Sequence, residues 1–140
     1  PKAPLRKREG MYDAYELGQA PHKVKIILLD TRYFRDTLKT SNSKEQRYIV
    51  NEEGDILGEE QWQWLEKELK KSDASIHIIG SSIQLVATQH AFEKWSNFPK
   101  ARARMLQLLA TVKPKNTFFV SGDRHIAEIS KMNVEGLPYP

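Results

Sequence analysis

Residues 118–125 read Phe-Phe-Val-Ser-Gly-Asp-Arg-His, and this stretch indicates both the fold and the chemistry of the chain. A hydrophobic run typical of a buried strand ends in a glycine turn. The turn carries the carboxylate of Asp123 and, two residues later, the imidazole of His125. Oxygen and nitrogen ligands placed together beyond a strand end suit a divalent or trivalent metal ion used for hydrolysis. The alternative for these two residues is a turn aspartate beside a surface histidine.

Three short apolar runs predict strands, over residues 24–29, 75–79 and 117–120. Their apolarity is nearly continuous and does not strictly alternate with polar residues. This pattern is typical of strands that are covered on both faces.

Two segments between these runs have helical periodicity. Residues 58–71 place Trp62, Leu65 and Leu69 on one face, with acidic residues in the first turn and lysines in the last. A second helix is predicted to begin at Pro99, where the missing proline N–H removes no helical hydrogen bond. Its buried stripe is predicted to comprise Ala101, Met105, Leu108, Leu109 and Val112.

The order strand–helix–strand–helix–strand predicts an α/β protein with at least partly parallel strands. Residues 37–55, a polar excursion after the first strand, are expected to form an exposed loop. Ligands of open α/β sheets bind beyond the carboxyl ends of the strands. We therefore expect the loops that begin at Asp30, Gly80 and Ser121 to converge on one rim of the sheet.

Asp30 and Arg32 follow the first strand, and two interpretations of them stay open. The Arg32 guanidinium is a fork that matches phosphate oxygens, which suits an anionic substrate held against a metal. Asp30 and Arg32 could equally form a structural ion pair that fixes the loop.

Other polar residues are predicted to have structural roles. His77 lies within a strand and is expected to be a hydrogen-bonded core residue, whereas His22 and His90 are expected at the surface. Ser81 and Ser82 are interpreted as turn-formers, because the Gly-x-Ser-x-Gly pattern of nucleophilic serines is absent.

Composition excludes several classes of protein. The chain has 140 residues, enough for one domain or part of one, and no cysteine, which excludes disulfides and thiolate chemistry. The net charge of +4 is accounted for by Lys2, Arg6, Lys7 and Arg8, and no nucleic-acid-binding motif accompanies it. No apolar run of membrane-spanning length occurs, and the first residue is Pro1, so we expect a processed or truncated chain.

Five blocks of the sequence, in this order, resemble the alkaline phosphatase D-like (PhoD-like) metallophosphatases. They are Leu-Asp-Thr-Arg-Tyr-Phe-Arg at 29–35, Leu-Gly-Glu-Glu-Gln-Trp-Gln-Trp-Leu at 57–65, Ile-Ile-Gly-Ser-Ser-Ile-Gln at 78–84, Glu-Lys-Trp-Ser-Asn-Phe-Pro at 93–99 and Ser-Gly-Asp-Arg-His at 121–125. The resemblance runs from about Gly10 to the end of the chain. Five ordered blocks are far more specific than any one of them.

The resemblance implies a four-layer α/β/β/α metallophosphoesterase sandwich that hydrolyses phosphate mono- or diesters. It implies that Asp123 and His125 are metal ligands and that calcium and iron are the metals. Arg32 would be a catalytic, substrate-binding residue facing the phosphate, and Asp30 would orient that arginine or its loop. A small phosphate ester is the expected partner, and a periplasmic or extracellular location is the expected one.

Family members carry further metal ligands upstream of the Asp-Thr-Arg block and continue into further strands downstream. We therefore expect residues 1–140 to be a partial catalytic domain, its C-terminal half, and to be inactive alone. A non-catalytic binding module from a split or degenerate phosphatase gene is the alternative, and a basic nucleic-acid-binding domain is a third interpretation.

Overall fold

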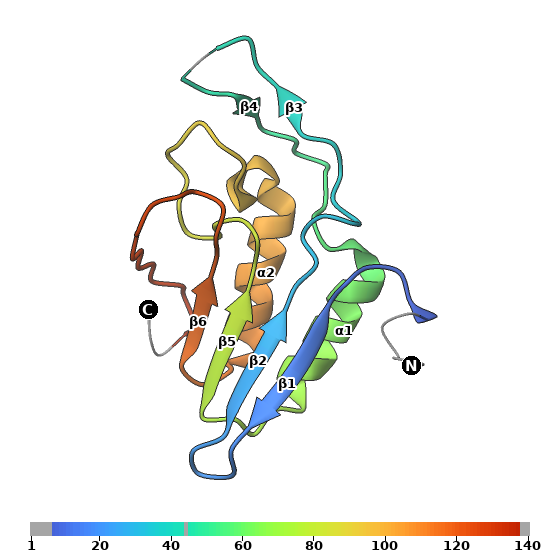
Figure 1. The fold of residues 1–140 in the computed structure, drawn as a ribbon, viewed down its shortest axis with the longest axis vertical. Helices are drawn as coiled ribbons and strands as arrows, with labels where there is room; N and C mark the ends of the chain where they lie inside the picture. Colours follow the sequence, from blue (N-terminus) through green and yellow to red (C-terminus); the bar gives the residue numbers. More distant parts are fainter. Residues whose placement is uncertain (1–6, 44, 138–140) are drawn as a thin grey trace.

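A computed structural model describes residues 7–43 and 45–137. Its main sheet has four strands in the order β1-β2-β5-β6. The strands are β1 (Asp13–Leu17), β2 (Val24–Leu28), β5 (Ile76–Gly80) and β6 (Thr117–Val120). β2, β5 and β6 are parallel neighbours, and β1 pairs antiparallel with β2 at one edge (Figure 1). The predicted α/β class and its partly parallel sheet are confirmed.

Two helices lie on the same face of this sheet, behind it in Figure 1. They are α1 (Gly58–Lys70) and α2 (Pro99–Val112), and a short 3₁₀ helix, η2 (Trp95–Asn97), precedes α2. α1 buries Trp62, Leu65 and Leu69, and α2 buries Met105 and Leu109, as expected from their spacing in the sequence. These side chains pack in one hydrophobic core with the inward-facing residues of the sheet.

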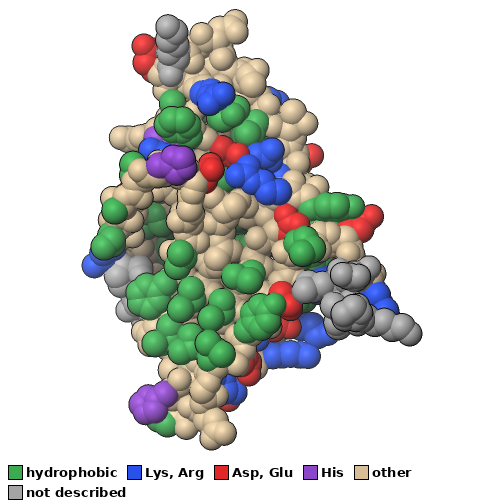
Figure 2. All heavy atoms as spheres, viewed as in Figure 1, with side chains coloured by type: hydrophobic (Ala, Val, Ile, Leu, Met, Phe, Trp, Pro, Cys, Tyr) green, Lys and Arg blue, Asp and Glu red, His purple; other side chains and the backbone are tan. Residues whose placement is uncertain are grey.

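The opposite face of the sheet is apolar and exposed. The strand register places Tyr15, Ile26, Ile78 and Phe118 in one row across all four strands. Phe118 is 58% exposed although its neighbour Phe119 packs against the core. Figure 2 shows the hydrophobic side chains gathered over this face. Near-continuous apolarity predicted strands covered on both faces, yet in the described residues the helices cover only one.

Some elements differ from the prediction. β1 was not predicted. The excursion over residues 37–55 contains a small two-stranded ribbon formed by β3 (Lys39–Thr40) and β4 (Tyr48–Ile49). The ribbon was not predicted because each strand has only two residues and no apolar periodicity. β5 begins one residue later than predicted and ends at Gly80. Within residues 7–43 and 45–137, neither helix has the length and apolarity that crossing a membrane requires.

Candidate functional site

The three loops that follow β2, β5 and β6 meet at one edge of the sheet. The strands are parallel and in register, so Leu28, Gly80 and Val120 end side by side. Hydrogen bonds continue past the strands: the amide of Leu29 donates to the Gly80 carbonyl, and the amide of Ser81 donates to the Val120 carbonyl, both at 2.9 Å. The predicted convergence of the loops on one rim is confirmed.

Side chains also join these loops. The hydroxyls of Thr31 and Ser82 are hydrogen-bonded to each other. Arg124, between the two predicted metal ligands, donates from Nη1 to Oε1 of Gln84 at 3.0 Å, and Nε2 of the same Gln84 donates to Glu128. The rim is therefore a connected surface in which each loop contacts a neighbour.

Asp30 holds the first of these loops by its backbone. Its carboxylate accepts hydrogen bonds from the amides of Met11, Arg32 and Tyr33, at 2.7, 2.9 and 2.9 Å. Burial raises the pKa of Asp30, the three backbone hydrogen bonds lower it, and the net shift is downward. The side-chain amide of the buried Gln61 fixes both the N–H and the carbonyl of Asp30. Asp30 thus orients its loop, as expected.

The Arg32 guanidinium pairs with Glu93 instead of Asp30. Its Nη1 lies 2.5 Å from Oε2 of Glu93, and Arg35 binds the other oxygen of the same carboxylate. The Arg32 side chain is 48% exposed and that of Glu93 only 14%. The alternative, an ion pair between Asp30 and Arg32, was wrong. The Asp30 carboxylate accepts hydrogen bonds from backbone amides, and the Arg32 guanidinium pairs with Glu93.

Asp123 and His125 lie in the exposed turn after β6. Both have left-handed backbone conformations, with φ of 73° and 53°. Such conformations are uncommon outside glycine and are found at functional sites. Within the described residues no group of three or more His, Cys, Asp or Glu side chains is placed to hold a metal ion. The carboxylate and imidazole fit a hydrolytic metal in chemical type but supply only part of a coordination shell.

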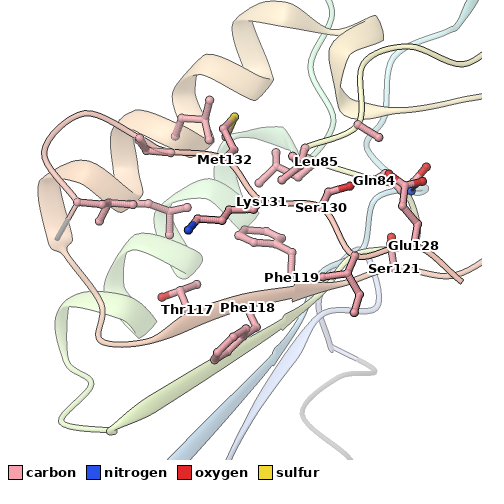
Figure 3. Close-up of a pocket in the computed structure, with 17 residues that line it drawn as sticks. Gln84, Leu85, Thr117, Phe118, Phe119, Ser121, Glu128, Ser130, Lys131 and Met132 are labelled. Carbon is pink, nitrogen blue, oxygen red and sulfur yellow. Dashed lines mark hydrogen bonds between the residues drawn. The ribbon is translucent and has the colours of Figure 1, made fainter. Parts of the chain in front are cut away.

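Two cavities adjoin the rim without including the predicted ligands. One of about 430 Å³ lies between β6, α2 and residues 128–137 (Figure 3). Phe119 and Met132 contribute to its mainly apolar wall, and Gln84 and Glu128 lie at its polar end. A second, of about 280 Å³, is lined by residues 86–90, Arg124 and Glu128. Neither lining contains Asp123, His125 or Arg32.

The remaining histidines are placed largely as expected. His77 is buried in β5, where its Nδ1 donates to the Lys115 carbonyl and its Nε2 accepts from the Ser72 hydroxyl, both at 2.8 Å. His22 is exposed. His90 is half-buried and therefore only partly at the surface, and burial, with the charges of Arg124 and Lys94, lowers its pKa.

The basic N-terminus is the feature on which the interpretation as a nucleic-acid-binding domain rests. Lys2 and Arg6 lie outside the described residues. The Arg8 guanidinium lies 3.9 Å from the centroid of the Tyr12 ring, so it forms a cation–π contact within this chain.

Sequence reasoning missed two residues of the rim, Glu93 and Gln61. Glu93 opens the block at 93–99, and no charge pattern near it in the sequence indicates its pairing with Arg32 and Arg35. Gln61 is a polar position beside the apolar stripe of α1, and nothing local in the sequence distinguishes it from the exposed Gln63.

A mainly parallel sheet with polar and charged side chains in the loops at its carboxyl edge is typical of α/β domains, which bind their ligands beyond the ends of the strands. The sequence model of the PhoD-like phosphatase family matches residues 2–138. The chain belongs to this family, as the five blocks predicted.

Two relatives indicate how much of such a protein the chain represents. The chain is 26% identical over 121 residues to alkaline phosphatase D of Bacillus subtilis (strain 168). The matched region covers 77% of this chain and 20% of that protein. The solved structure of PhoD is similar with a TM-score of 0.64 and 21% identity, over 80% of this chain and 23% of the other. This second likeness shows a shared fold. The chain therefore spans about a fifth of the length of the curated relative that it matches.

Proposed function

We propose that the chain is part of the catalytic domain of a metal-dependent phosphatase that hydrolyses small phosphate mono- or diesters. The observation that carries the proposal is the turn with Asp123 and His125 at the same rim as the loop with Arg32. The family and the likeness to alkaline phosphatase D support the reaction class.

Four residues of the rim have a role in this proposal. Asp123 and His125 contribute an oxygen and a nitrogen ligand, and calcium and iron are the metals that we propose for the site. A metal bound there would supply Lewis-acid chemistry and a more acidic bound water. Arg32 is the substrate-binding and catalytic group, because its half-exposed guanidinium keeps donors free for phosphate oxygens. Asp30 supports Arg32 by holding its backbone amide at 2.9 Å.

The open face of the sheet supports a larger domain. An apolar sheet face spanning four strands is unusual on a surface exposed to solvent and normal in a layer that packs against another sheet or helix. We propose that a second sheet of the longer protein covers it, which would give the four-layer sandwich. The remaining metal ligands would lie in that part of the chain. A periplasmic or extracellular location belongs to the same proposal and rests on the family resemblance.

A second candidate is a non-catalytic binding module derived from such a phosphatase. The observation that favours it is that, within residues 7–43 and 45–137, no third His, Cys, Asp or Glu side chain joins Asp123 and His125 in a group that could hold a metal ion. Under either candidate the 140 residues alone are expected to be inactive, because two ligands do not complete a hydrolytic centre.

Substitution of Asp123 tests the metal site in the longer protein that contains this chain. Asp123→Asn is expected to lower the bound metal by at least half, because the amide loses the anionic charge that the ion requires. Elemental analysis of the purified variant measures the effect. Asp73→Asn is the matched control, since Asp73 is exposed and pairs with Lys23 on the surface. Undiminished metal in Asp123→Asn would refute the ligand role.

A further inference from the structure

Glu93 is a nearly buried carboxylate shared by two arginines. Its side chain is 14% exposed, and its two oxygens bind Arg32 and Arg35 separately. Both arginines belong to the loop after β2, about sixty residues earlier in the chain. The proposed function uses Arg32 and leaves Glu93 and Arg35 without a role.

The segment that carries Glu93 is held firmly by its neighbours. The amide of Lys94 donates to the Asn97 side chain at 2.9 Å, and the amide of Trp95 donates to the Gln84 carbonyl at 3.0 Å. The Trp95 indole, which is fully buried, donates to the Ser81 hydroxyl at 3.0 Å. Glu93 is therefore presented from a fixed backbone, joined to the loop after β5.

Arg32 is fixed at both of its ends. Its backbone amide is bound by Asp30 and its guanidinium by Glu93. A guanidinium has five N–H donors. Among the described residues, the only hydrogen-bond partner of the Arg32 guanidinium is Glu93. The remaining donors stay available to an oxyanion.

We propose that Glu93 is the positioning residue of the phosphate site, holding the Arg32 guanidinium ready for the substrate while Arg35 secures Glu93 from the other side. This inference rests on the proposed function, in which Arg32 binds the phosphate. Its physical basis is preorganisation: a long side chain that is already immobilised loses less conformational freedom when the substrate binds.

A double-mutant cycle in the longer protein tests this role, with hydrolysis of 4-nitrophenyl phosphate as the assay. Glu93→Gln is expected to raise KM about threefold to tenfold and to change kcat by less than about twofold. If Glu93 acted only as a negative charge near an anionic substrate, its neutralisation would lower KM, so the direction of the change separates the two roles. Glu53→Gln is the matched control, because Glu53 forms an exposed ion pair with Lys100 and should leave KM unchanged.

The cycle identifies the residue through which Glu93 acts. In an Arg32→Ala background, Glu93→Gln is expected to have no further effect on KM. An undiminished effect in that background would mean that Glu93 acts through the structure of the loop, and would overturn the proposal. Arg35→Lys, which loosens Glu93 without touching Arg32, is expected to raise KM in the same direction and by less. Unchanged KM in both Glu93→Gln and Arg35→Lys would also overturn it.

A crystal structure of the Glu93→Gln variant without substrate gives a readout independent of turnover. The proposal expects the Arg32 guanidinium to be ordered on residue 93 in the unaltered protein and displaced or spread over several positions in the variant. An identical Arg32 position in both structures would overturn it. Failure of the unaltered protein to hydrolyse phosphate esters would instead refute the proposed function, and the two failures are thus distinguishable.

Discussion

His77 shows at the scale of a single residue how burial decides between a ligand and a core side chain. It lies in β5 among the core, and both of its ring nitrogens have protein partners. Burial lowers the pKa of His77, the hydrogen bond from the ring to the Lys115 carbonyl opposes this shift, and the charge of Lys25 adds to it. The native state therefore favours the neutral ring.

This shift predicts a loss of stability in mild acid. The unfolded chain takes up a proton near pH 6.5 and the native state only at lower pH, so the free energy of unfolding falls as the pH drops below 6.5. His77→Gln, whose amide can replace both hydrogen bonds, is expected to lose less stability than the unaltered protein between pH 7.5 and 5.5. Urea denaturation at the two pH values measures this, and equal losses would show that His77 does not contribute. The pKa of His90 is also lowered, so the stability of the His77→Gln variant is still expected to depend on pH to a smaller extent.

At the scale of an element, the start of α1 depends on a glycine and on an aspartate three residues before it. Gly58 has φ of 71°, and the preceding Leu57 offers no side-chain cap. The Asp55 carboxylate accepts from the Gly58 amide at 2.8 Å and from the Trp62 indole, so it ties the helix start to the core. A Cβ at position 58 would lie 2.9 Å from Cγ of Phe34.

We therefore expect Gly58→Ala to lower the free energy of unfolding by about 2 kcal/mol, from the left-handed backbone and the contact with Phe34. Gly122→Ala is the matched control, because a Cβ at Gly122 meets nothing within 4 Å. It is expected to change the stability by less than about 0.5 kcal/mol. Chemical denaturation compares the two variants, and equal stabilities would contradict the role assigned to Gly58.

For the whole molecule, the proposal that a second sheet of the longer protein covers the exposed sheet face can be tested on Phe118. Phe118 is 58% exposed in this chain, where its truncation would remove little buried surface. In the longer protein we expect Phe118→Ala to lower the free energy of unfolding by about 3 kcal/mol, as in a packed core. Ile129→Ala is the control, since Ile129 is fully exposed and lies outside the sheet. A change below about 0.5 kcal/mol for Phe118→Ala would mean that the face stays open.

Local sequence patterns predicted the helices and the three parallel strands because periodicity and apolarity are properties of neighbouring residues. Pro99 marked the first residue of α2, and the runs at 24–29 and 117–120 matched their strands within one residue. β1 was missed because its five residues, Asp-Ala-Tyr-Glu-Leu, have weak apolarity at an edge of the sheet. The strand forms because its backbone pairs antiparallel with β2, a contact that its own sequence does not indicate.

The sequence by itself determined the α/β class, the family and the residues Asp123, His125 and Arg32 as candidates, because these follow from order and motif. Only the tertiary structure decided that Arg32 pairs with Glu93 and Asp30 with backbone amides. It also decided that one face of the sheet stays uncovered in the described residues. The physical reason is that the contacts of Arg32 with Glu93 and of Asp30 with Met11 join segments that are 61 and 19 residues apart, and only folding brings such segments together.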